Sequence, residues 1–479
     1  MTRAALDWQV VSQELGPLLS HNSSIFGPRD ARWANSTARY QEYAAPNFTM
    51  IVQVGVESDV STIVRYANRN SLPFYTVNRG HGLPVSQGSF RGLGIDMQLL
   101  TGITIGEDQQ SARFQGGTYG QQVMDELWEQ GFVTTTGSCG CVGLLGPGLG
   151  GGLGRQQGFH GLISDNFRTL NVVLADGSEI TVSNTSHPDL FWAMKGAGHN
   201  FGIVTSFELN IFPRLIDTWY YRNYVFTQDK LEPLFEELNN LQGIGQQPVE
   251  MAAQYGMYTL DPSISETEAI IWWTFAYAGP QSEASQYLAP FDNLGPLSVT
   301  DGNVPYPEVP SVQGTGILNA TCDKGLSRIV GPAGLQVYNV TTQRQIYDLF
   351  NRNIQHSYPA LLSSAVIMEG YSVAGVLAAN PDDSAYPHRA DYLLMQTVVA
   401  YTPDASLDAY AREWASANQA LWNQGQPTRR PSVYVNYASG TEALSAIYGE
   451  EPWRLERLRS LKARYDPNNR FSYYNPIPS

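Results

Sequence analysis

Two glycine-rich segments in the first third of the chain constrain its fold more than any other feature. The first covers residues 76–84 (TVNRGHGLP) and the second covers residues 136–154 (TGSCGCVGLLGPGLGGGLG). Glycine allows positive φ angles and lets the backbone approach a ligand closely. Arrays of backbone N–H groups of this kind suit a diphosphate. Because His81 and Cys139 lie inside these segments, we hypothesise that the two loops hold a flavin.

Length and charge restrict the class of protein. The chain has 479 residues, of which 42% are hydrophobic and 15% are charged, and its formal net charge is -15. This length allows two or three domains with a large core. The negative charge argues against nucleic acid or an anionic membrane surface as a partner. The longest apolar run, residues 269–278, is too short to span a bilayer and fits buried strands.

The cellular compartment stays open at this stage. No apolar segment of a signal peptide is visible in residues 1–7, and three cysteines do not predict a disulfide framework. Six N-glycosylation sequons begin at Asn22, Asn35, Asn47, Asn184, Asn319 and Asn339. About three or four would arise by chance in a chain of this composition. A cytoplasmic enzyme and a secreted one both remain compatible with the sequence.

The first half of the chain has the pattern of an α/β unit followed by further strands. We expect a short lead-in over residues 1–45, a strand at 50–54, a helix opening at 57–60 with Ser58 as its N-cap, and a strand at 72–77 that leads into the first glycine-rich segment. The Asp176-Gly177 pair predicts a hairpin between strands at 170–175 and 179–182. A helix from Asp189 and a strand at 202–209 follow.

The pattern changes near residue 213. From there to about residue 402, helical patterns alternate with strands, of which the clearest are at 254–260, 270–278, 363–370 and 392–401. A loop rich in proline and glycine, around residues 295–316, interrupts them. Residues 431–479 predict a strand and a helix at 453–465. We expect a sheet covered by helices in this half of the chain.

Two other interpretations of the glycine-rich segments are weaker. Residues 146–151 (GPGLGG) satisfy the G-x-G-x-x-G pattern, but no strand precedes them and position 171 is asparagine rather than an acidic residue. Cys139 and Cys141 could bind a metal together with His160 or His81, although their spacing matches no zinc pattern. We therefore predict no metal site. Taken alone, both cysteines would be interpreted as small buried residues.

Several motifs together resemble one known family, the flavin-linked oxidases of the vanillyl-alcohol-oxidase and berberine-bridge-enzyme type. NRGHG (78–82) is similar to the histidine loop of the family, and GSCGCVG (137–143) is similar to its G-x-C-x-x-V-G. The most specific match is DLFWAMKGAGHNFGIV (189–204). Further similar segments are GLISDN (161–166), VLADG (173–177), YPHR (386–389), YVNY (434–437) and YDPNNRF (465–471). The resemblance covers most of the chain, although Arg79 replaces a glycine and residues 146–148 lack the G-G-H of the family.

The resemblance implies a fold and a cofactor. The fold class is α+β, with an FAD-binding domain of two subdomains over residues 1–212, a substrate domain with an antiparallel sheet covered by helices over 213–430, and a return to the FAD-binding domain over 431–479. It implies FAD bound covalently through His81 and Cys139. Further cofactor contacts are expected from Asn78, Arg79, Gly80, Gly82, Ser138, Val142, Gly143, Gly148, Asp165, Asn166, Ile203, Asn436 and Asn475.

The resemblance also implies an oxidase. Such an enzyme removes a hydride from an alcohol, hydroxyl or amine carbon of a small substrate and passes it to the flavin, after which molecular oxygen gives hydrogen peroxide. For the base we favour Tyr434, with Arg389 supplying a nearby positive charge that lowers its pKa. Asn436 is expected two positions along the same strand, at the flavin carbonyl edge. Core packing is the alternative for Tyr434.

Other functions remain open. Glu369 is the nearest carboxylate that could act as the base, and its alternative is a surface carboxylate at a strand end. The same pocket could serve a cyclase or a dehydrogenase that does not use oxygen. A non-catalytic binding protein without flavin is the third possibility. Aromatic residues in the second half favour a hydrophobic or aromatic metabolite, such as a secondary metabolite, as substrate; the sequence does not predict the oligomeric state.

Overall fold

The computed structural model describes residues 7–357 and 359–478, and the first glycine-rich segment lies at the end of a four-stranded sheet. The strand order is β1 (Ser24–Phe26), β2 (Asn47–Gln53), β4 (Arg91–Asp96) and β3 (Phe74–Val77). β2, β4 and β3 run parallel, while β1 is antiparallel to β2. The expected strand–helix–strand unit is confirmed. The lead-in over residues 1–45 also contributes β1 to this sheet, a strand that the sequence did not predict.

Helix α3 (Asp59–Arg69) connects β2 to β3 and buries the apolar side chains at positions 60, 63, 64 and 67. Ser58 occupies its N-cap position, as expected, but its side chain makes no capping hydrogen bond. α1 (Trp8–Leu15) packs near this unit, because its Val11 and Leu15 share the hydrophobic cluster of α3. This packing fixes β3, and with it the direction in which the 78–82 loop leaves the sheet.

The second glycine-rich segment lies beside a five-stranded antiparallel sheet. Its order is β5 (Ile103–Ile105), β6 (Ser111–Gln115), β10 (Ile203–Asn210), β8 (Phe167–Val173) and β9 (Glu179–Ser183). The hairpin between β8 and β9 is confirmed, and Gly177 adopts a φ of 86° in its turn. Residues 146–151 lie in and after the short helix α5 (Leu145–Leu149), with no parallel strand before them. The dinucleotide-fold alternative is therefore wrong.

The second half of the chain forms a seven-stranded antiparallel sheet. Its order is β15 (Ser298–Val304), β12 (Trp219–Phe226), β14 (Ile270–Tyr277), β13 (Ala253–Thr259), β17 (Ala365–Tyr371), β18 (Leu393–Tyr401) and β16 (Ser327–Leu335). The four strands expected from the sequence are present. The expected loop at 295–316 is partly wrong, because β15 pairs with β12 along the exposed edge of the sheet. Asp301 and Gly302 gave β15 little strand character in the sequence.

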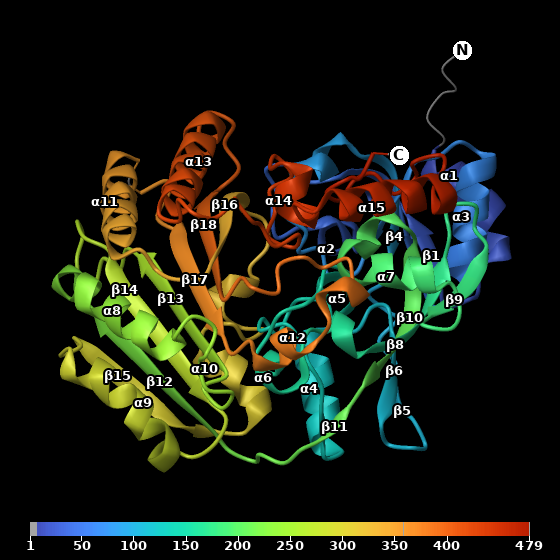
Figure 1. Ribbon diagram of the computed structural model, residues 1–479. Coiled ribbons are helices and arrows are strands. Elements are labelled where there is room, and N and C mark those ends of the chain that lie inside the picture. The colour runs from blue at the N-terminus through green and yellow to red at the C-terminus, as the bar shows by residue number, and fades with distance from the viewer. Residues whose placement is uncertain (1–6, 358, 479) are drawn as a thin grey trace.

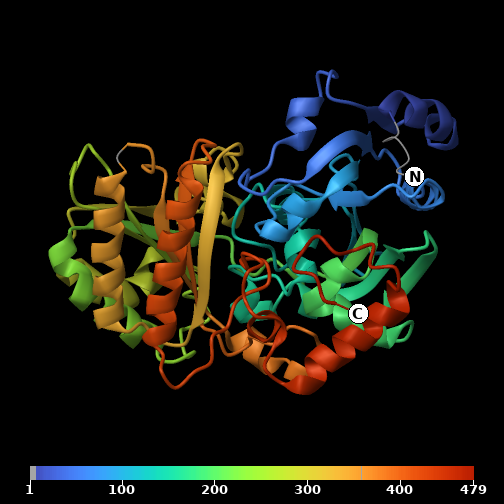
Figure 2. The same ribbon diagram turned by 90° about the horizontal axis from the view of Figure 1, so that it is seen from above.

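Four helices cover one face of this sheet, and the other face looks toward the N-terminal half (Figures 1 and 2). They are α8 (Leu231–Gln242), α9 (Gln281–Asn293), α11 (Val340–His356) and α13 (Asp408–Gln424). Successive side chains along β17 point to opposite faces of the sheet. Val366 and Met368 are buried under the helices, whereas Ile367, Glu369 and Tyr371 face a cavity.

Two later segments return to the N-terminal half. Residues 374–391 leave the seven-stranded sheet, and their helix α12 (Ala374–Ala378) packs against α6 (Gln157–His160). After α13, the chain forms α14 (Leu444–Tyr448) and α15 (Pro452–Tyr465), which lie along the N-terminal half in Figure 1. The structure gives no strand in residues 431–478, so the strand expected there is wrong. Hydrogen bonds of Tyr434 and Asn436 to residues 147 and 152 position this segment instead.

The remaining elements connect these layers. They are α2 (Trp33–Thr37), α4 (Gly120–Glu129), β7 (Phe132–Val133), α7 (Pro188–Ala197), β11 (Phe212–Pro213) and α10 (Val309–Val312). β7 and β11 pair where the chain passes toward the seven-stranded sheet. In the described part of the chain, no helix is both long and apolar enough to cross a membrane.

Candidate active site

A cavity of about 380 Å³ lies between the two glycine-rich segments and the seven-stranded sheet. Its size is in the usual range for a small-molecule or cofactor site. Both loops, the segment around residue 436 and the exposed face of β13, β14, β17 and β18 contribute to its wall. Most of the predicted site residues line it: Asn78, Arg79, Gly80, His81, Gly82, Ser138, Cys139, Val142, Gly143, Ile203, Glu369, Tyr434 and Asn436.

His81 is held at one end of this cavity with one ring nitrogen free. Its Nε2 lies 3.6 Å from the Sγ of Cys141, and its ring centroid is 5.4 Å from that of Tyr40. Its Nδ1 is buried and has no hydrogen-bond partner among the described residues. Burial, followed by the charges of Lys324, Arg328 and Arg79, lowers the pKa of His81 to about 3. The imidazole is therefore neutral near pH 7 and keeps a lone pair for bonding.

The three cysteines divide into a disulfide and one thiol. Cys141 and Cys322 are bonded to each other across 181 residues of sequence. The sequence does not predict this disulfide, because two of the three cysteines lie two positions apart and the third is far away in the chain. Cys139 remains as the free thiol and lines the cavity. Burial, reinforced by the nearby charge of Glu369, raises its pKa to about 12.

The disulfide also decides between the two cysteines of the second loop. A sulfur that is bonded to Cys322 can serve neither as a metal ligand nor as an attachment point. The alternative of a metal bound by Cys139 and Cys141 together with His160 or His81 is therefore wrong. Within residues 7–357 and 359–478, no cluster of three or more histidine, cysteine or acidic residues has the arrangement of a metal site.

Buried polar atoms without partners show that the cavity fits an anionic dinucleotide. Arg39 is 3% exposed, yet its Nε and one terminal nitrogen have no partner among the described residues. The Nε atoms of Arg79 and Arg470 are also buried and unpartnered, and all three guanidinium groups line the cavity. One buried and two half-buried guanidinium groups without a carboxylate partner among the described residues are costly unless an anion compensates them. A diphosphate beside the 78–82 loop would supply that charge.

Glu369 stands at the centre of a hydrogen-bonded group of hydroxyls. The phenol of Tyr437 donates to its Oε1 and that of Tyr371 donates to its Oε2, each at 2.7 Å. Ser138 Oγ lies 2.8 Å from the Tyr371 phenol and also accepts a hydrogen bond from Tyr255 at 2.7 Å. Burial raises the pKa of Glu369, and the two phenols oppose this shift. The surface-carboxylate alternative for Glu369 is therefore wrong.

Tyr434 faces the cavity, but its expected activation by Arg389 is wrong. Its hydroxyl accepts hydrogen bonds from Asn436 Nδ2 at 2.6 Å and from the Gly152 N–H at 3.2 Å. Burial raises the pKa of Tyr434 to about 12 despite these bonds. Such a phenol is a poor base near neutral pH. Asn436 also donates to the Pro147 carbonyl at 3.0 Å, while its Oδ1 has no partner among the described residues.

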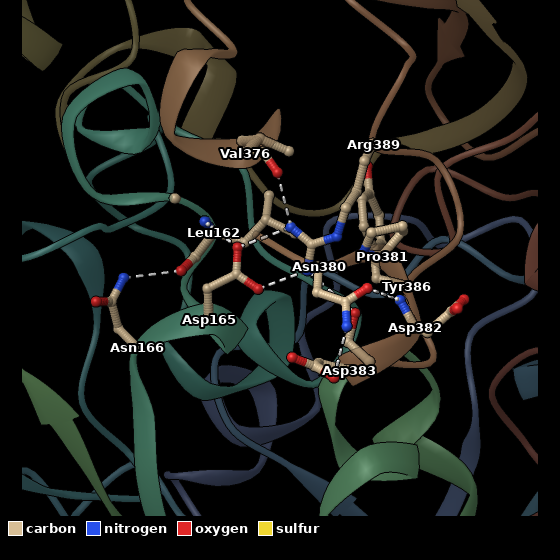
Figure 3. Close-up of polar contacts among 12 residues, drawn as sticks. Leu162, Asp165, Asn166, Val376, Asn380, Pro381, Asp382, Asp383, Tyr386 and Arg389 are labelled. Atoms are coloured by element: carbon tan, nitrogen blue, oxygen red, sulfur yellow. Dashed lines mark hydrogen bonds and ion pairs between the residues drawn. The ribbon is translucent and has the colours of Figure 1, made fainter. Parts of the chain in front are cut away.

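Arg389 instead forms an ion pair with Asp165 (Figure 3). Its two terminal nitrogens lie 2.6 and 2.9 Å from the carboxylate oxygens, and a further bond reaches the Val376 carbonyl at 3.1 Å. Neither residue lines the cavity. The pair joins the loop after α6 to residues 374–391. Arg389 and Asp165 are therefore placed as structural residues rather than as a catalytic and a cofactor-binding residue.

This ion pair gives a stability prediction. The side chains of Arg389 and Asp165 are only 6% and 13% exposed. Removing one partner of a buried pair leaves an uncompensated charge and costs about 3–5 kcal/mol. We expect Arg389→Leu to lower the free energy of unfolding by that amount, measured by chemical denaturation. The matched control is Arg430→Leu, whose pair with Glu450 is exposed and is expected to contribute about 0–1 kcal/mol. Equal effects of the two variants would contradict this assignment.

Three other expected cofactor contacts lie outside the cavity. Gly148 packs against Ile163 and Phe167, where a Cβ would come within 2.9 Å of both. Asn166 donates to the carbonyls of His160 and Leu162, as Figure 3 shows for Leu162. Asn475 donates to the Val435 carbonyl at 2.8 Å. These residues shape the loops behind the site, which motif similarity alone could not distinguish from direct contacts.

The structure adds site residues that the sequence did not indicate. Arg39, Tyr40 and Arg470 reach the cavity from the two ends of the chain, and Tyr255, Tyr371 and Tyr437 surround Glu369. None belongs to a glycine-rich motif, and Tyr437 and Arg470 lie in the YVNY and YDPNNRF segments without having been singled out there. Only the period-2 pattern of β17, which places positions 367, 369 and 371 on one face, could have pointed to Tyr371.

Comparison with known proteins supplies the family. A model described as "FAD binding domain" matches residues 48–183, and one described as "Berberine and berberine like" matches residues 433–478. The FAD-linked oxidoreductase anuG of Penicillium roqueforti (strain FM164) is 73% identical over 476 residues, which are 99% of this chain and 93% of anuG. The chain belongs to the berberine-like FAD-linked oxidoreductases. The FAD-linked oxidoreductase OXR2 of Pyricularia oryzae is 47% identical over all of this chain and 93% of its own.

The fold of this FAD-linked oxidoreductase is shared with solved structures. The glucooligosaccharide oxidase from Acremonium strictum superimposes with a TM-score of 0.79 at 19% identity, over 98% of this chain and 99% of that one. The expected α+β class, an FAD-binding part combined with an antiparallel sheet covered by helices, is confirmed. So are the expected cofactor class, FAD, and the expected enzyme class, an oxidoreductase.

Proposed function

We propose that this oxidoreductase carries FAD through two covalent bonds, at His81 and Cys139, and acts as an oxidase. It removes a hydride from an alcohol, hydroxyl or amine carbon of a small molecule, and oxygen is reduced to hydrogen peroxide. The observation that carries the proposal is found in the wall of one cavity. There, a neutral imidazole whose Nδ1 has no partner within residues 7–357 and 359–478 lies together with the free thiol of Cys139. The glucooligosaccharide oxidase from Acremonium strictum has a 6-S-cysteinyl, 8α-N1-histidyl FAD, which supports the same pair of attachment residues here.

The chain supplies distinct groups for each part of the cofactor. Backbone N–H groups of residues 78–82 and the guanidinium groups of Arg39, Arg79 and Arg470 would hold the diphosphate. Asn436 Oδ1, which is buried and unpartnered, is available to accept a hydrogen bond from the ring system. When bound, FAD accepts a hydride from the substrate carbon. All other steps depend on the side chains of the cavity.

Glu369 is the proposed base. Its carboxylate would take the proton from the substrate hydroxyl or amine as the hydride leaves. Tyr437 and Tyr371 hold both oxygens in place, and burial raises the pKa of Glu369 toward the working pH of a base. Tyr434 instead orients Asn436 by accepting its 2.6 Å hydrogen bond. We thus replace Tyr434 by Glu369 as the candidate for proton transfer.

The substrate would rest on the face of the seven-stranded sheet that lines the cavity. Tyr255 lies directly opposite Glu369 in the register, and Met257 lies opposite both Ile367 and Trp272. Gln396, which faces Ile367, adds a polar group to this surface. An aromatic and aliphatic floor with few polar groups suits a small hydrophobic or aromatic metabolite. A fungal secondary metabolite fits this chemistry.

The decisive experiment combines the cofactor and the reaction. The purified protein is expected to be yellow, to keep its colour in an acid precipitate, and to show an intact mass increased by one FAD. With a panel of benzylic and allylic alcohols and amines, we expect substrate-dependent release of hydrogen peroxide. Bleaching by substrate without peroxide would identify an oxygen-independent dehydrogenase or cyclase instead. A colourless protein without the added mass would refute the proposal.

A further inference from the structure

One segment that follows α10 is joined by hydrogen bonds and a disulfide to the N-terminal half of the chain, next to the proposed attachment residues. We call residues 313–326, between α10 and β16, the bridging segment. The Gly140 N–H donates to the Thr315 carbonyl at 2.8 Å, and the Thr315 hydroxyl donates to the Ser138 carbonyl at 3.0 Å. The Gly325 N–H donates to the Arg39 carbonyl at 2.9 Å. The bridging segment thus contacts the residues on both sides of Cys139 and the segment before Tyr40.

The buried Arg155 strengthens the first of these contacts. Its guanidinium donates to Gln313 Oε1 at 2.7 Å, to Thr315 Oγ1 at 3.0 Å and to the Ser138 carbonyl at 2.8 Å. Gln313, Gly314, Thr315 and Thr321 line the cavity. The bridging segment is therefore part of the wall around the cofactor site, and its position depends on the 138–141 loop.

The Cys141–Cys322 disulfide joins the bridging segment covalently to the second glycine-rich segment, beside His81. The Cys141 sulfur lies 3.6 Å from His81 Nε2, and the Tyr40 ring lies near the same imidazole at a centroid distance of 5.4 Å. A disulfide sulfur accepts hydrogen bonds weakly and cannot donate them. Contact with the sulfur therefore favours the tautomer with hydrogen on Nε2. In that tautomer, the lone pair is on Nδ1, the nitrogen that is buried without a partner among the described residues.

We propose that the Cys141–Cys322 disulfide positions His81 for its bond to FAD. Cys141 and Cys322 act through His81: they fix the ring, select the tautomer and hold the bridging segment in place. This inference rests on the proposed covalent attachment. In the net step, the imidazole N–H and a methyl C–H of the flavin each lose a hydrogen, a C–N bond forms, and oxygen takes up both hydrogens as hydrogen peroxide. The disulfide is not consumed.

The test compares attachment at His81 with attachment at Cys139. The double variant Cys141→Ser with Cys322→Ser removes the disulfide and keeps the side chains similar in size. After proteolysis, a doubly linked flavin joins the peptides of His81 and Cys139, whereas a singly linked flavin stays on the Cys139 peptide alone. Since misplacement of a reacting group by about 1 Å can slow a reaction about 100-fold, we expect the joined peptides to fall at least about tenfold. The Cys139-linked flavin should persist.

The matched control is Leu318→Ser, in the same segment. Leu318 is fully exposed, so its replacement should leave the joined peptides at the wild-type level. Should the double variant fail to fold, the unchanged chain can be produced in a reducing and in an oxidising bacterial cytosol. We expect free thiols at Cys141 and Cys322 and mainly Cys139-linked flavin in the reducing host.

Two results would have different meanings. If the double variant, or the chain from the reducing host, carries as much joined peptide as the oxidised wild type, the role of the disulfide is refuted while the covalent attachment stands. If the oxidised wild type itself carries no covalent flavin, the proposed function fails at an earlier point. Circular dichroism and the thermal midpoint of each variant show whether its fold is retained.

Discussion

Glu369→Gln is expected to lower kcat by about 10²- to 10⁴-fold, the usual contribution of a general base. The amide has nearly the same shape as the carboxylate, so substrate should still bind. It cannot accept the proton that the substrate must lose. The measurement is steady-state peroxide release with the best substrate of the panel, together with the rate at which substrate bleaches the flavin in a rapid-mixing experiment without oxygen.

The pH dependence of the same variant adds a second criterion. Burial raises the pKa of Glu369, and only the ionised carboxylate can act as a base. The kcat of the wild type should therefore rise with pH as Glu369 loses its proton, and this limb should be absent in Glu369→Gln. The control variant is Glu236→Gln, which alters an exposed carboxylate of α8 and should leave both kcat and its pH profile unchanged.

The free energy of unfolding should fall as pH rises, whereas kcat should increase. The folded protein holds a proton on Glu369 over a pH range in which the unfolded chain has already lost it, because the folded pKa is the higher of the two. The free energy of unfolding therefore falls as pH rises through that range. Above it, Glu369→Gln should have a higher thermal midpoint than the wild type. A variant that loses stability and activity together would indicate that Glu369 has only a structural role, and activity near the wild-type level would exclude it as the base.

The sequence was most informative where a local pattern determines the structure. The β2–α3–β3 unit, the Asp176-Gly177 hairpin and four central strands of the seven-stranded sheet follow from hydrophobic periodicity and turn residues, and they are present. The edge strand β15 was missed because its seven residues are mostly exposed. Its backbone pairing with β12 depends on tertiary structure, to which a local pattern is insensitive.

Residues predicted from the glycine-rich motifs line the cavity, where the backbone itself forms the wall. The loops at 78–82 and 138–143 are examples, because their glycines let the backbone form the cavity wall. Polar residues outside such loops were ambiguous. Asp165 and Arg389 lie in motifs of the family, yet they bind each other rather than the cavity. A carboxylate and a guanidinium separated by 224 residues give no sign in the sequence that they form a pair.

Contacts between distant parts of the chain were beyond the reach of the sequence. The Cys141–Cys322 disulfide and the approach of Arg39 and Arg470 to one cavity depend on how the two halves pack. Cysteine spacing cannot identify a pair 181 residues apart when a third cysteine lies two positions from one of them. The disulfide provides the strongest argument for Cys139 as the attachment residue, since it leaves Cys139 as the free thiol among the described residues.

His81→Ala and Cys139→Ala should each leave the flavin attached by one bond. The variant that combines His81→Ala with Cys139→Ala should release the flavin completely. Each single variant removes one bonding atom, but the diphosphate contacts and the other bond remain. After acid precipitation, the single variants should give a yellow pellet with an intact mass increased by one FAD. The double variant should give a colourless pellet and a yellow supernatant.

The attachment point in each single variant identifies the partner of the flavin. In His81→Ala the flavin should be found only on the peptide that contains Cys139, and in Cys139→Ala only on the peptide that contains His81. The absorption spectrum of the flavin should differ between the two, because a sulfur on the ring and a nitrogen on a methyl carbon perturb it differently. Leu318→Ser serves as the matched control, because Leu318 is fully exposed and its replacement should leave both links in place. A joined peptide that persists in either single variant would show that another side chain forms the second bond.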